Sequence, residues 1–355
     1  LPEFIKGGAG NSILSLCQNL SKNKFHIHIL CLGRCQYKYE FRNIAKIFEL
    51  KAKKTLLAQN EIRKIINKVL VNDEKTLFIS NLFHANVLTG LLQPKKKNLK
   101  FIFTDRTTLS ELFTYFGFID FIKKSVLKTL VKITYRKADL IIANSKKVAK
   151  DLGFFSKCKT TSVYPGSFNK FKKKVRQNNK SPKQIIWIGR LAKEKGVEIL
   201  LETFNKINKK KYILKIVGDG PLRKKVESKI NAYGLRNNIK LLGFQKKIFR
   251  YLKKSDLLIN TSFFEGFPNV VIEALSHSVP VICSKSNGGI NEILANGKYG
   301  DLFNISSKNN LDIKVNNFLK NPSRLRKMAL SSKNHLHRFE KKKSARIYEK
   351  IFDNL

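Results

Sequence analysis

Two glutamates, Glu265 and Glu273, stand eight residues apart around a turn that joins a strand-like run to a helix-like run. Glu265 lies in the turn, and Pro268 is well placed for the first turn of the helix. The helix is apolar on every side of Glu273, so we expect it to be buried. A lone buried carboxylate costs on the order of several kcal/mol unless something hydrogen-bonds to it. A polyhydroxy ligand could satisfy Glu273; the alternative is that its carboxylate caps a neighbouring loop.

Two cations, Arg190 and Lys195, stand five residues apart after another strand-like run, at the mouth of a predicted helix. Arginine can bind a phosphate through two parallel hydrogen bonds, and lysine acts as a point charge. The free N–H groups at a helix N-terminus, such as the one after Pro268, also favour an anion. This combination is typical of a phosphate site, and a solvated basic turn is the alternative.

Glycines and one aromatic residue follow other strand-like runs. Gly7 and Gly8 stand between a first strand and a first helix, where backbone N–H groups can approach a phosphate. A tight turn explains these two glycines equally well. Gly218 and Phe244 come after two later strands. Because open parallel sheets bind ligands at the carboxyl ends of their strands, these positions are candidates for a binding site.

His84 and Arg106 occupy the same kind of position in the first half of the chain. His84 follows the strand-like run 77–80, and Arg106 follows the run 100–105. A lone histidine is usually structural, but one at a strand's carboxyl end can serve a ligand. Arg106 could contact a phosphate of an acceptor, or it could form a salt bridge with Asp105.

The segment 265–273 and the Gly-Arg-Leu…Lys-Gly segment 189–196 together resemble the retaining glycosyltransferases of family 4, which have the GT-B fold. The resemblance implies that Glu265 faces a donor sugar, that Glu273 binds the ribose of its nucleotide, and that the two cations hold its diphosphate. The implied catalytic set is Glu265, Arg190, Lys195 and His84. The implied donor-binding set is Gly7, Gly8, Gly218, Phe244, Gly266, Phe267, Pro268, Asn269, Val270 and Glu273.

Strand-like and helix-like runs alternate along the 355 residues, which predicts an α/β protein built from parallel βα units. A polar, lysine-rich stretch at 167–183 divides the alternation into two halves. We therefore expect two Rossmann-like, doubly wound domains that face a central cleft, as in GT-B enzymes. The predicted N-terminal, acceptor-side domain comprises 1–166 and a returning C-terminal helix at about 333–355. The predicted nucleotide-sugar domain comprises 167–332. Leu1 looks like part of a first strand, so we expect a few preceding residues to be missing.

The expected activity is the transfer of a sugar, with retention of configuration, from a nucleotide-sugar, taken to be a UDP-sugar. The acceptor would be a glycan or a lipid-linked saccharide in cell-surface polysaccharide or glycoconjugate synthesis. No Asp-x-Asp occurs in the chain, so we expect neither a metal site nor another cofactor. Another GT-B enzyme, such as a nucleotide-sugar epimerase or a phosphorylase, is the alternative, and a basic nucleic-acid-binding protein is a further one.

The formal net charge of +46 admits nucleic-acid binding, attraction to an anionic membrane, or a lysine-rich compositional bias. No nucleic-acid-binding motif accompanies the charge, so we expect no nucleic-acid partner. No apolar run is long enough to span a bilayer. An aromatic run at 113–122 precedes a predicted long helix over about 109–137, with Lys124, Lys128, Lys132 and Arg136 on one face. We expect either interfacial docking of this helix or a core helix with a solvated basic face. Docking would make the protein cytoplasmic and peripheral on the cytoplasmic face of the inner membrane.

Overall fold

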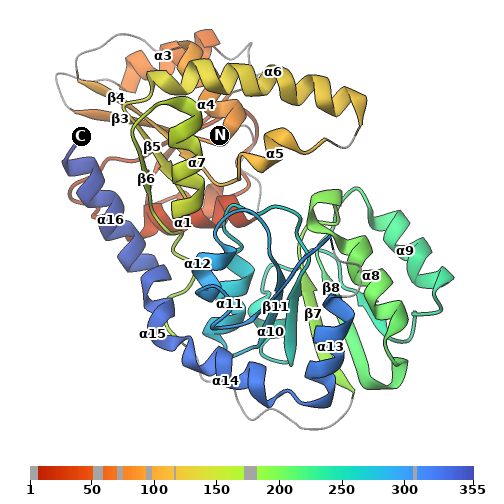
Figure 1. Cartoon of the computed structure of the whole chain (residues 1–355). Helices are drawn as coiled ribbons and strands as arrows, with labels where there is room; N and C mark the ends of the chain where they lie inside the picture. The colour runs from red at the N-terminus through yellow and green to blue at the C-terminus, as the bar shows by residue number, and fades with distance from the viewer. Residues whose placement is uncertain are drawn as a thin grey trace. The chain divides into compact units, whose positions relative to one another are not determined.

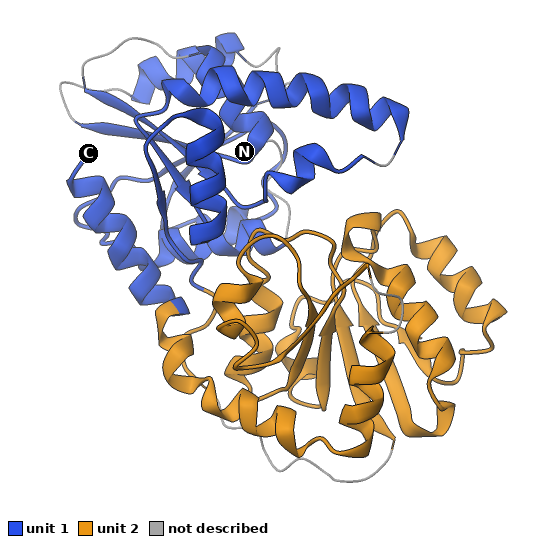
Figure 2. Cartoon of the chain, in the orientation of Figure 1, with its two compact units in different colours: residues 1–166, 339–355 blue, residues 167–338 orange. Residues whose placement is uncertain are grey.

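The computed structural model describes residues 7–50, 59–69, 75–92, 98–115, 117–171, 182–306 and 310–355. The chain forms two compact units, coloured separately in Figure 2. Unit 1 comprises residues 1–166 and 339–355, and unit 2 comprises residues 167–338. The predicted first strand and most of the predicted linker lie outside the described residues.

Unit 1 contains a four-stranded parallel sheet in the order β3-β4-β5-β6 and a separate parallel pair, β1-β2. Its strands are β1 (His28–Cys31), β2 (Lys46–Glu49), β3 (Thr76–Asn81), β4 (Leu99–Asp105), β5 (Leu140–Ala143) and β6 (Thr160–Ser162). Its helices are α1 (Gly8–Asn19), α2 (Lys38–Phe41), α3 (Gln59–Val69), α4 (Phe83–Leu92), α5 (Ser110–Phe113), α6 (Phe118–Thr134), α7 (Lys146–Ser156) and α16 (Lys341–Asp353). The sequence did not predict α2 or β2, both of which are four residues long.

The C-terminal helix α16 returns to unit 1 and packs on α1 (Figure 1). Its apolar side, which includes Tyr348 and Phe352, joins a buried cluster with residues of β4 and β5. The Phe352 ring meets Phe25 edge-on, with 5.8 Å between the ring centroids. Because both rings leave water, this returning segment is held mainly by apolar burial.

Unit 2 contains a six-stranded sheet in the order β12-β11-β10-β7-β8-β9, and all its strand pairs are parallel. Figure 1 shows helices on both faces of this sheet. Its strands are β7 (Lys183–Ile188), β8 (Tyr212–Val217), β9 (Ile239–Leu241), β10 (Leu257–Asn260), β11 (Val281–Ser284) and β12 (Asp301–Phe303). Its helices are α8 (Val197–Lys206), α9 (Arg223–Ala232), α10 (Phe249–Leu252), α11 (Asn269–Ser276), α12 (Ile290–Leu294), α13 (Asn310–Lys320), α14 (Ser323–Ser331) and α15 (Lys333–Leu336). The sequence did not predict α13 or α14.

The long helix predicted over 109–137 is interrupted in the structure. Gly117 adopts φ = +139°, a backbone conformation that favours glycine, and it separates α5 from α6. The lysine face predicted for this helix is also wrong at Lys124. The Lys124 ammonium pairs with Asp120 at 2.9 Å and donates to the Thr114 carbonyl at 2.7 Å, and its side chain is only 15% exposed.

Candidate active site

The strand order of unit 2 reverses between β7 and β10. From β7 the chain proceeds outward to β8 and β9, and it then returns to place β10 on the other side of β7. Loops that leave two such strands at their carboxyl ends diverge and form a crevice, which is where doubly wound sheets bind ligands. The loop after β7 carries Arg190 and Lys195, and the loop after β10 carries Glu265.

The structure brings Lys195 and Glu265 together. The Lys195 Nζ lies 2.5 Å from Glu265 Oε1, and the Ser262 hydroxyl donates to the same oxygen at 3.0 Å. Both side chains of the pair are mostly buried, so water screens them less than a surface pair. A cation and a carboxylate that are 70 residues apart in the sequence are thus in direct contact.

The backbone beneath this pair is closely fitted. The Thr261 hydroxyl donates to the Lys195 carbonyl at 2.8 Å and accepts from the Trp187 indole N–H at 3.0 Å. Gly196 has φ = +63°, and a Cβ built on it would lie 2.1 Å from the Thr261 carbonyl oxygen. Any larger residue at 196 would therefore push the two loops apart. Sequence reasoning missed Thr261 and Ser262, although polar residues directly after a buried strand were a signal for them.

Arg190 is placed differently from Lys195. Its guanidinium pairs with Glu194 on the same loop at 2.5 Å, and its side chain is 65% exposed. Burial raises the pKa of the Glu194 carboxyl, but the hydrogen bonds from Arg190 and from a backbone N–H outweigh burial, and the pKa is lowered. Glu194 therefore stays ionised beside the arginine, which points into solvent.

Glu273 is not the buried carboxylate that the sequence predicted. Helix α11 buries Val271, Ile272, Ala274 and Leu275. Asn269, Val270 and Glu273 are partly exposed, because they share the opposite face of the helix. The side-chain amide oxygen of Asn269, Oδ1, accepts a hydrogen bond from the Ser167 hydroxyl at 3.0 Å.

The segment that leads into α11 is held by the loop after β11. Gly266, Phe267 and Pro268 are buried, and the Gly289 N–H donates to the Gly266 carbonyl at 2.8 Å. Gly288 has φ = +129°, and a Cβ there would lie 1.8 Å from the Glu265 carbonyl oxygen. The position of Glu265 therefore depends on glycines of a second loop.

Gly218 and Phe244 follow β8 and β9 at the same edge of the sheet. Gly218 has φ = +133°, and a Cβ on it would lie 1.8 Å from the Gly189 carbonyl oxygen, so this turn packs directly against the turn that precedes Arg190. Phe244 is exposed, and its ring is free of the unit 2 core.

In unit 1, Gly7 precedes α1 and Gly8 begins it. A Cβ built on either glycine meets no atom within 4 Å, so packing within the protein does not require glycine there. His84 is exposed in the first turn of α4. It follows Leu82, whose φ of +74° is strained for a leucine. The structure thus places His84 at the carboxyl end of β3, as the sequence predicted.

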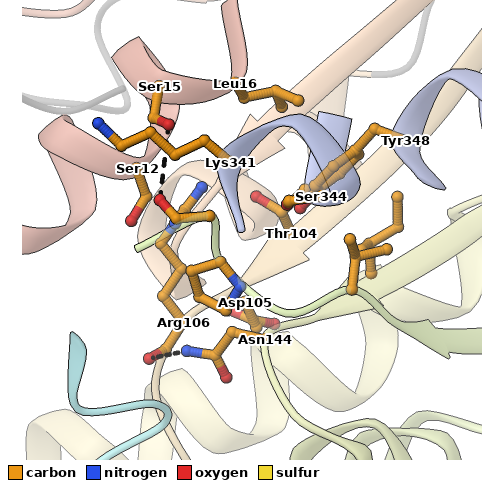
Figure 3. A pocket seen from close by; sticks show the side chains of 14 residues that line it. Ser12, Ser15, Leu16, Thr104, Asp105, Arg106, Asn144, Lys341, Ser344 and Tyr348 are labelled. Carbon is orange, nitrogen blue, oxygen red and sulfur yellow. Dashed lines mark hydrogen bonds between the residues drawn. The ribbon is translucent and has the colours of Figure 1, made fainter. Parts of the chain in front are cut away.

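Asp105 and Arg106 are neighbours in sequence, but the described residues show no ion pair between them. Asp105 is buried, accepts a hydrogen bond from Asn86 at 3.4 Å, and has a second oxygen without a hydrogen-bond partner. Burial raises the pKa of Asp105 to about 7. Arg106 is partly exposed and lines a small pocket of unit 1, where Figure 3 shows it with Asp105, Ser12, Ser15 and Lys341.

The described parts of the chain contain no group of three or more His, Cys, Asp or Glu side chains that could hold a metal ion. Among the described helices, none is long and apolar enough to cross a bilayer.

Two family models together match nearly the whole chain. The model of glycosyl transferases group 1 matches residues 168–335, and the model of glycosyltransferase family 4 matches residues 6–166. This chain belongs to the family 4-type glycosyltransferases. The boundary between the two matched segments falls at the boundary between the two units.

Several known proteins are similar to this glycosyltransferase. An uncharacterised glycosyltransferase of Methanocaldococcus jannaschii is 31% identical over 271 residues, which are 70% of this chain and 66% of that protein. The N-acetylgalactosamine-N,N'-diacetylbacillosaminyl-diphospho-undecaprenol 4-alpha-N-acetylgalactosaminyltransferase of Campylobacter jejuni is 25% identical, across 96% of this chain and 94% of its own length. The crystal structure of Anabaena HepE in complex with UDP and glucose matches with a TM-score of 0.82 at 18% identity and covers 100% of this chain and 98% of that one. The fold of this glycosyltransferase is therefore GT-B, with two Rossmann-like α/β units.

Proposed function

We propose that this glycosyltransferase transfers a sugar, with retention of configuration, from a UDP-sugar to a lipid-linked saccharide or glycan. The Lys195–Glu265 pair at the reversal of the unit 2 sheet is the observation that carries the proposal. The UDP in the HepE structure supports the choice of nucleotide, and the diphospho-undecaprenol in the name of the Campylobacter relative supports the acceptor class. Such acceptors suit the synthesis of cell-surface polysaccharides or glycoconjugates.

The proposed reaction breaks the bond between the anomeric carbon and the diphosphate. Negative charge then collects on the leaving diphosphate, and positive groups already aimed at that charge lower the barrier most. Arg190, Lys195 and the N-terminus of α11 supply them. A diphosphate would compete with Glu265 for the Lys195 ammonium. Glu265 would then be released toward the sugar. Donor binding would thus place Lys195 on the diphosphate and free Glu265 to contact the sugar.

The remaining roles are assigned by resemblance. Glu273 would bind the ribose from the open face of α11, and Phe244 would line the base. His84 would approach the sugar, and Gly7 and Gly8 would lie over the phosphates. The transfer would proceed by front-face attack without a protein nucleophile, and no metal or other cofactor would be needed. In this assignment unit 1 carries the acceptor and unit 2 carries the nucleotide-sugar.

A panel of UDP-, GDP- and ADP-sugars tested for thermal stabilisation of the purified protein checks the donor. A sugar nucleotide at a hundred times its Kd should raise the free energy of unfolding by about 2.7 kcal/mol. Product analysis with and without a saccharide acceptor then separates a transferase from an epimerase or a phosphorylase. The proposal fails if no nucleotide-sugar stabilises the protein.

We further propose that the enzyme works as a peripheral protein at an anionic membrane surface, on the cytoplasmic face of the inner membrane. The aromatic surface of α5 and α6 favours this. Its exposed apolar residues are Phe113, Tyr115, Phe118, Ile119, Phe121, Ile122 and Val126. Phe118 and Ile119 are 76% and 69% exposed, and a contiguous apolar patch of this kind usually has a partner.

Lysines surround the aromatic surface. Lys123 and Lys132 are exposed on α6, and the Lys128 ammonium lies over the Phe113 ring at 5.0 Å from its centroid. Helix α7, which contacts α6, adds the exposed Phe154, with the Lys157 ammonium 4.7 Å from its ring centroid. Aromatic rings can enter the headgroup boundary while lysines face anionic lipid, at about 1 kcal/mol per cation.

Sedimentation with vesicles that contain anionic phospholipid tests the docking. The triple variant Lys123→Glu, Lys128→Glu, Lys132→Glu should lose binding, and molar salt should largely reverse the binding of the wild type. The control, Lys206→Glu, Lys210→Glu, Lys224→Glu, carries the same change in net charge on exposed lysines of unit 2. Equal losses in both variants would assign attachment to overall charge. No binding of the wild type to these vesicles would indicate a soluble acceptor. A salt-dependent binding assay with duplex DNA and RNA tests the nucleic-acid alternative.

A further inference from the structure

A small pocket of unit 1 lies between α1, the carboxyl ends of β4 and β5, and the first half of α16 (Figure 3). Its volume is about 10 Å³, which is room for about one water molecule or one ion of similar size. All residues that line it belong to unit 1. Arg106 and Lys341 are the cations among them, and Asp105 is the one carboxyl group.

The Arg106 guanidinium has no negative partner in the described parts of the chain. It makes no hydrogen bond or ion pair with those residues, and its Nε atom is shut off from solvent. Asp105 does not neutralise it, because consecutive residues of an extended segment point to opposite sides. The Asp105 carboxyl accepts a hydrogen bond from Asn86 instead, at 3.4 Å.

Two other ionisable groups act on Arg106, and both are neutral. They are the Tyr348 phenol and the Cys17 thiol. Burial raises the pKa of both, that of the Cys17 thiol to about 12, so neither carries a charge at pH 7. Burial also lowers the pKa of Arg106, but a guanidinium keeps its proton in proteins. Since a partly buried cation without a counter-ion is costly, an anion from solution would stabilise it.

The other lining groups can also serve an anion. The Ser15 hydroxyl lies 3.5 Å from the Gly166 carbonyl oxygen, a long hydrogen bond, so its proton can turn to a stronger acceptor. Ser12 lies three residues earlier on the same face of α1 and donates to the Gly8 carbonyl at 2.9 Å. Lys341 begins α16, where free backbone N–H groups favour negative charge. Close packing fixes this residue, since a Cβ built on Gly166 would lie 2.6 Å from the Lys341 Cα atom.

We propose that this pocket binds a single-atom anion such as chloride, held by charge-assisted contacts with Arg106 and Lys341. A tetrahedral phosphate has several heavy atoms and exceeds a space of this size. Because Arg106 follows β4 and Lys341 begins α16, the anion would join the sheet of unit 1 to its returning helix. Neither a nucleotide-sugar nor an acceptor is involved, so the site does not depend on the proposed function.

Crystals soaked in sodium bromide test the position of the anion. Bromide carries the same charge as chloride, and its anomalous scattering distinguishes it from water. We expect an anomalous peak within hydrogen-bonding distance of the Arg106 guanidinium. A pocket that holds only water, or peaks confined to lysines on the open surface, would overturn the proposal.

Urea unfolding in solution tests whether the binding is specific. Sodium chloride replaces sodium gluconate at constant ionic strength, so screening of the +46 net charge does not change. The folded-to-unfolded ratio of the wild type should rise and level off, by about elevenfold at ten times the Kd of chloride. Arg106→Gln, which removes the charge, should lose this response, whereas Arg136→Gln, on an exposed arginine of unit 1, should keep it. Equal responses in the two variants would contradict a site at Arg106.

Two further measurements decide the matter if Arg106→Gln does not fold. Lys341→Gln changes a partly exposed side chain, so the fold should survive, and the variant should need about tenfold more chloride for the same gain. An unchanged chloride requirement would exclude Lys341 from the site and overturn the link to α16. Sodium phosphate in place of chloride, at the same ionic strength, should give no gain. A gain with phosphate and none with chloride would show that the pocket opens for a tetrahedral anion and would refute the single-atom assignment.

Discussion

Charged residues follow the strands of both parallel sheets at their carboxyl ends, but they form ion pairs in unit 2 and not between Asp105 and Arg106 in unit 1. In unit 2, Lys195 and Arg190 each hold a carboxylate, on Glu265 and Glu194. In unit 1, Asp105 and Arg106 are adjacent in the chain, yet the described residues show no ion pair between them; Asp105 is buried and Arg106 is partly exposed. A paired cation can exchange its carboxylate for an anionic ligand, because the ligand replaces the charge that is lost. A buried unpaired carboxyl group loses its charge instead, and its pKa rises. Adjacent residues thus need not form a pair, whereas residues on distant loops can.

The largest effect should come from Asp105→Asn. The pKa of folded Asp105 lies above that of an unfolded aspartate. The contribution of this group to the free energy of unfolding is therefore fully present below about pH 4 and is lost as pH rises through about 7. The total loss should be about 4 kcal/mol, and Asn, which does not ionise, should abolish it. Urea unfolding between pH 4 and pH 8.5 measures this difference. Asp151→Asn, which removes a surface pair with Lys147, serves as the control and should change little. Parallel pH profiles of wild type and Asp105→Asn would contradict the claim that burial raises the pKa of Asp105.

Lys195→Ala should lower transferase turnover by a factor of tens to about a hundred, or roughly 2–3 kcal/mol, because in the proposed mechanism it would remove a charged hydrogen bond to the departing diphosphate. Glu265→Gln, which can still accept from Lys195, separates the sugar role from the phosphate role. Steady-state kinetics with the donor found in the panel measures both variants. Wild-type turnover in Lys195→Ala would show that the diphosphate site lies elsewhere.

Arg190→Ala should also lower turnover by tens-fold, but with a change in stability below about 0.5 kcal/mol, since the Arg190 side chain is 65% exposed and water screens its pair with Glu194. Thermal unfolding and kinetics on one preparation distinguish the two effects. A loss of stability larger than that of Lys195→Ala would show that the Arg190 pair contributes more to stability than the Lys195 pair.

Excess chelator should have the smallest effect, which is none. If cations of the chain neutralise the diphosphate, transfer should continue in EDTA at the untreated rate. Loss of activity that manganese or magnesium restores would mean that a metal shares the role given to Lys195 and Arg190.

Much of the architecture follows from local sequence. Alternating apolar runs, such as the one that forms β8 at Tyr212–Val217, predicted the parallel α/β class, because strand and helix periodicities differ. The positions of Arg190, Lys195 and Glu265 after buried strands predicted that they would share one edge of a sheet. Short elements such as α2 were not predicted, since four residues carry too little periodicity.

Tertiary structure alone decided how these side chains are paired. The sequence could not show that Lys195 binds Glu265, because that contact depends on which strands are neighbours and on close approaches at Gly196 and Gly288. Nor could it show that Lys124 turns inward, since the break at Gly117 sets that geometry. Periodicity is a property of neighbouring residues, whereas pairing is a property of the folded surface on which distant loops meet.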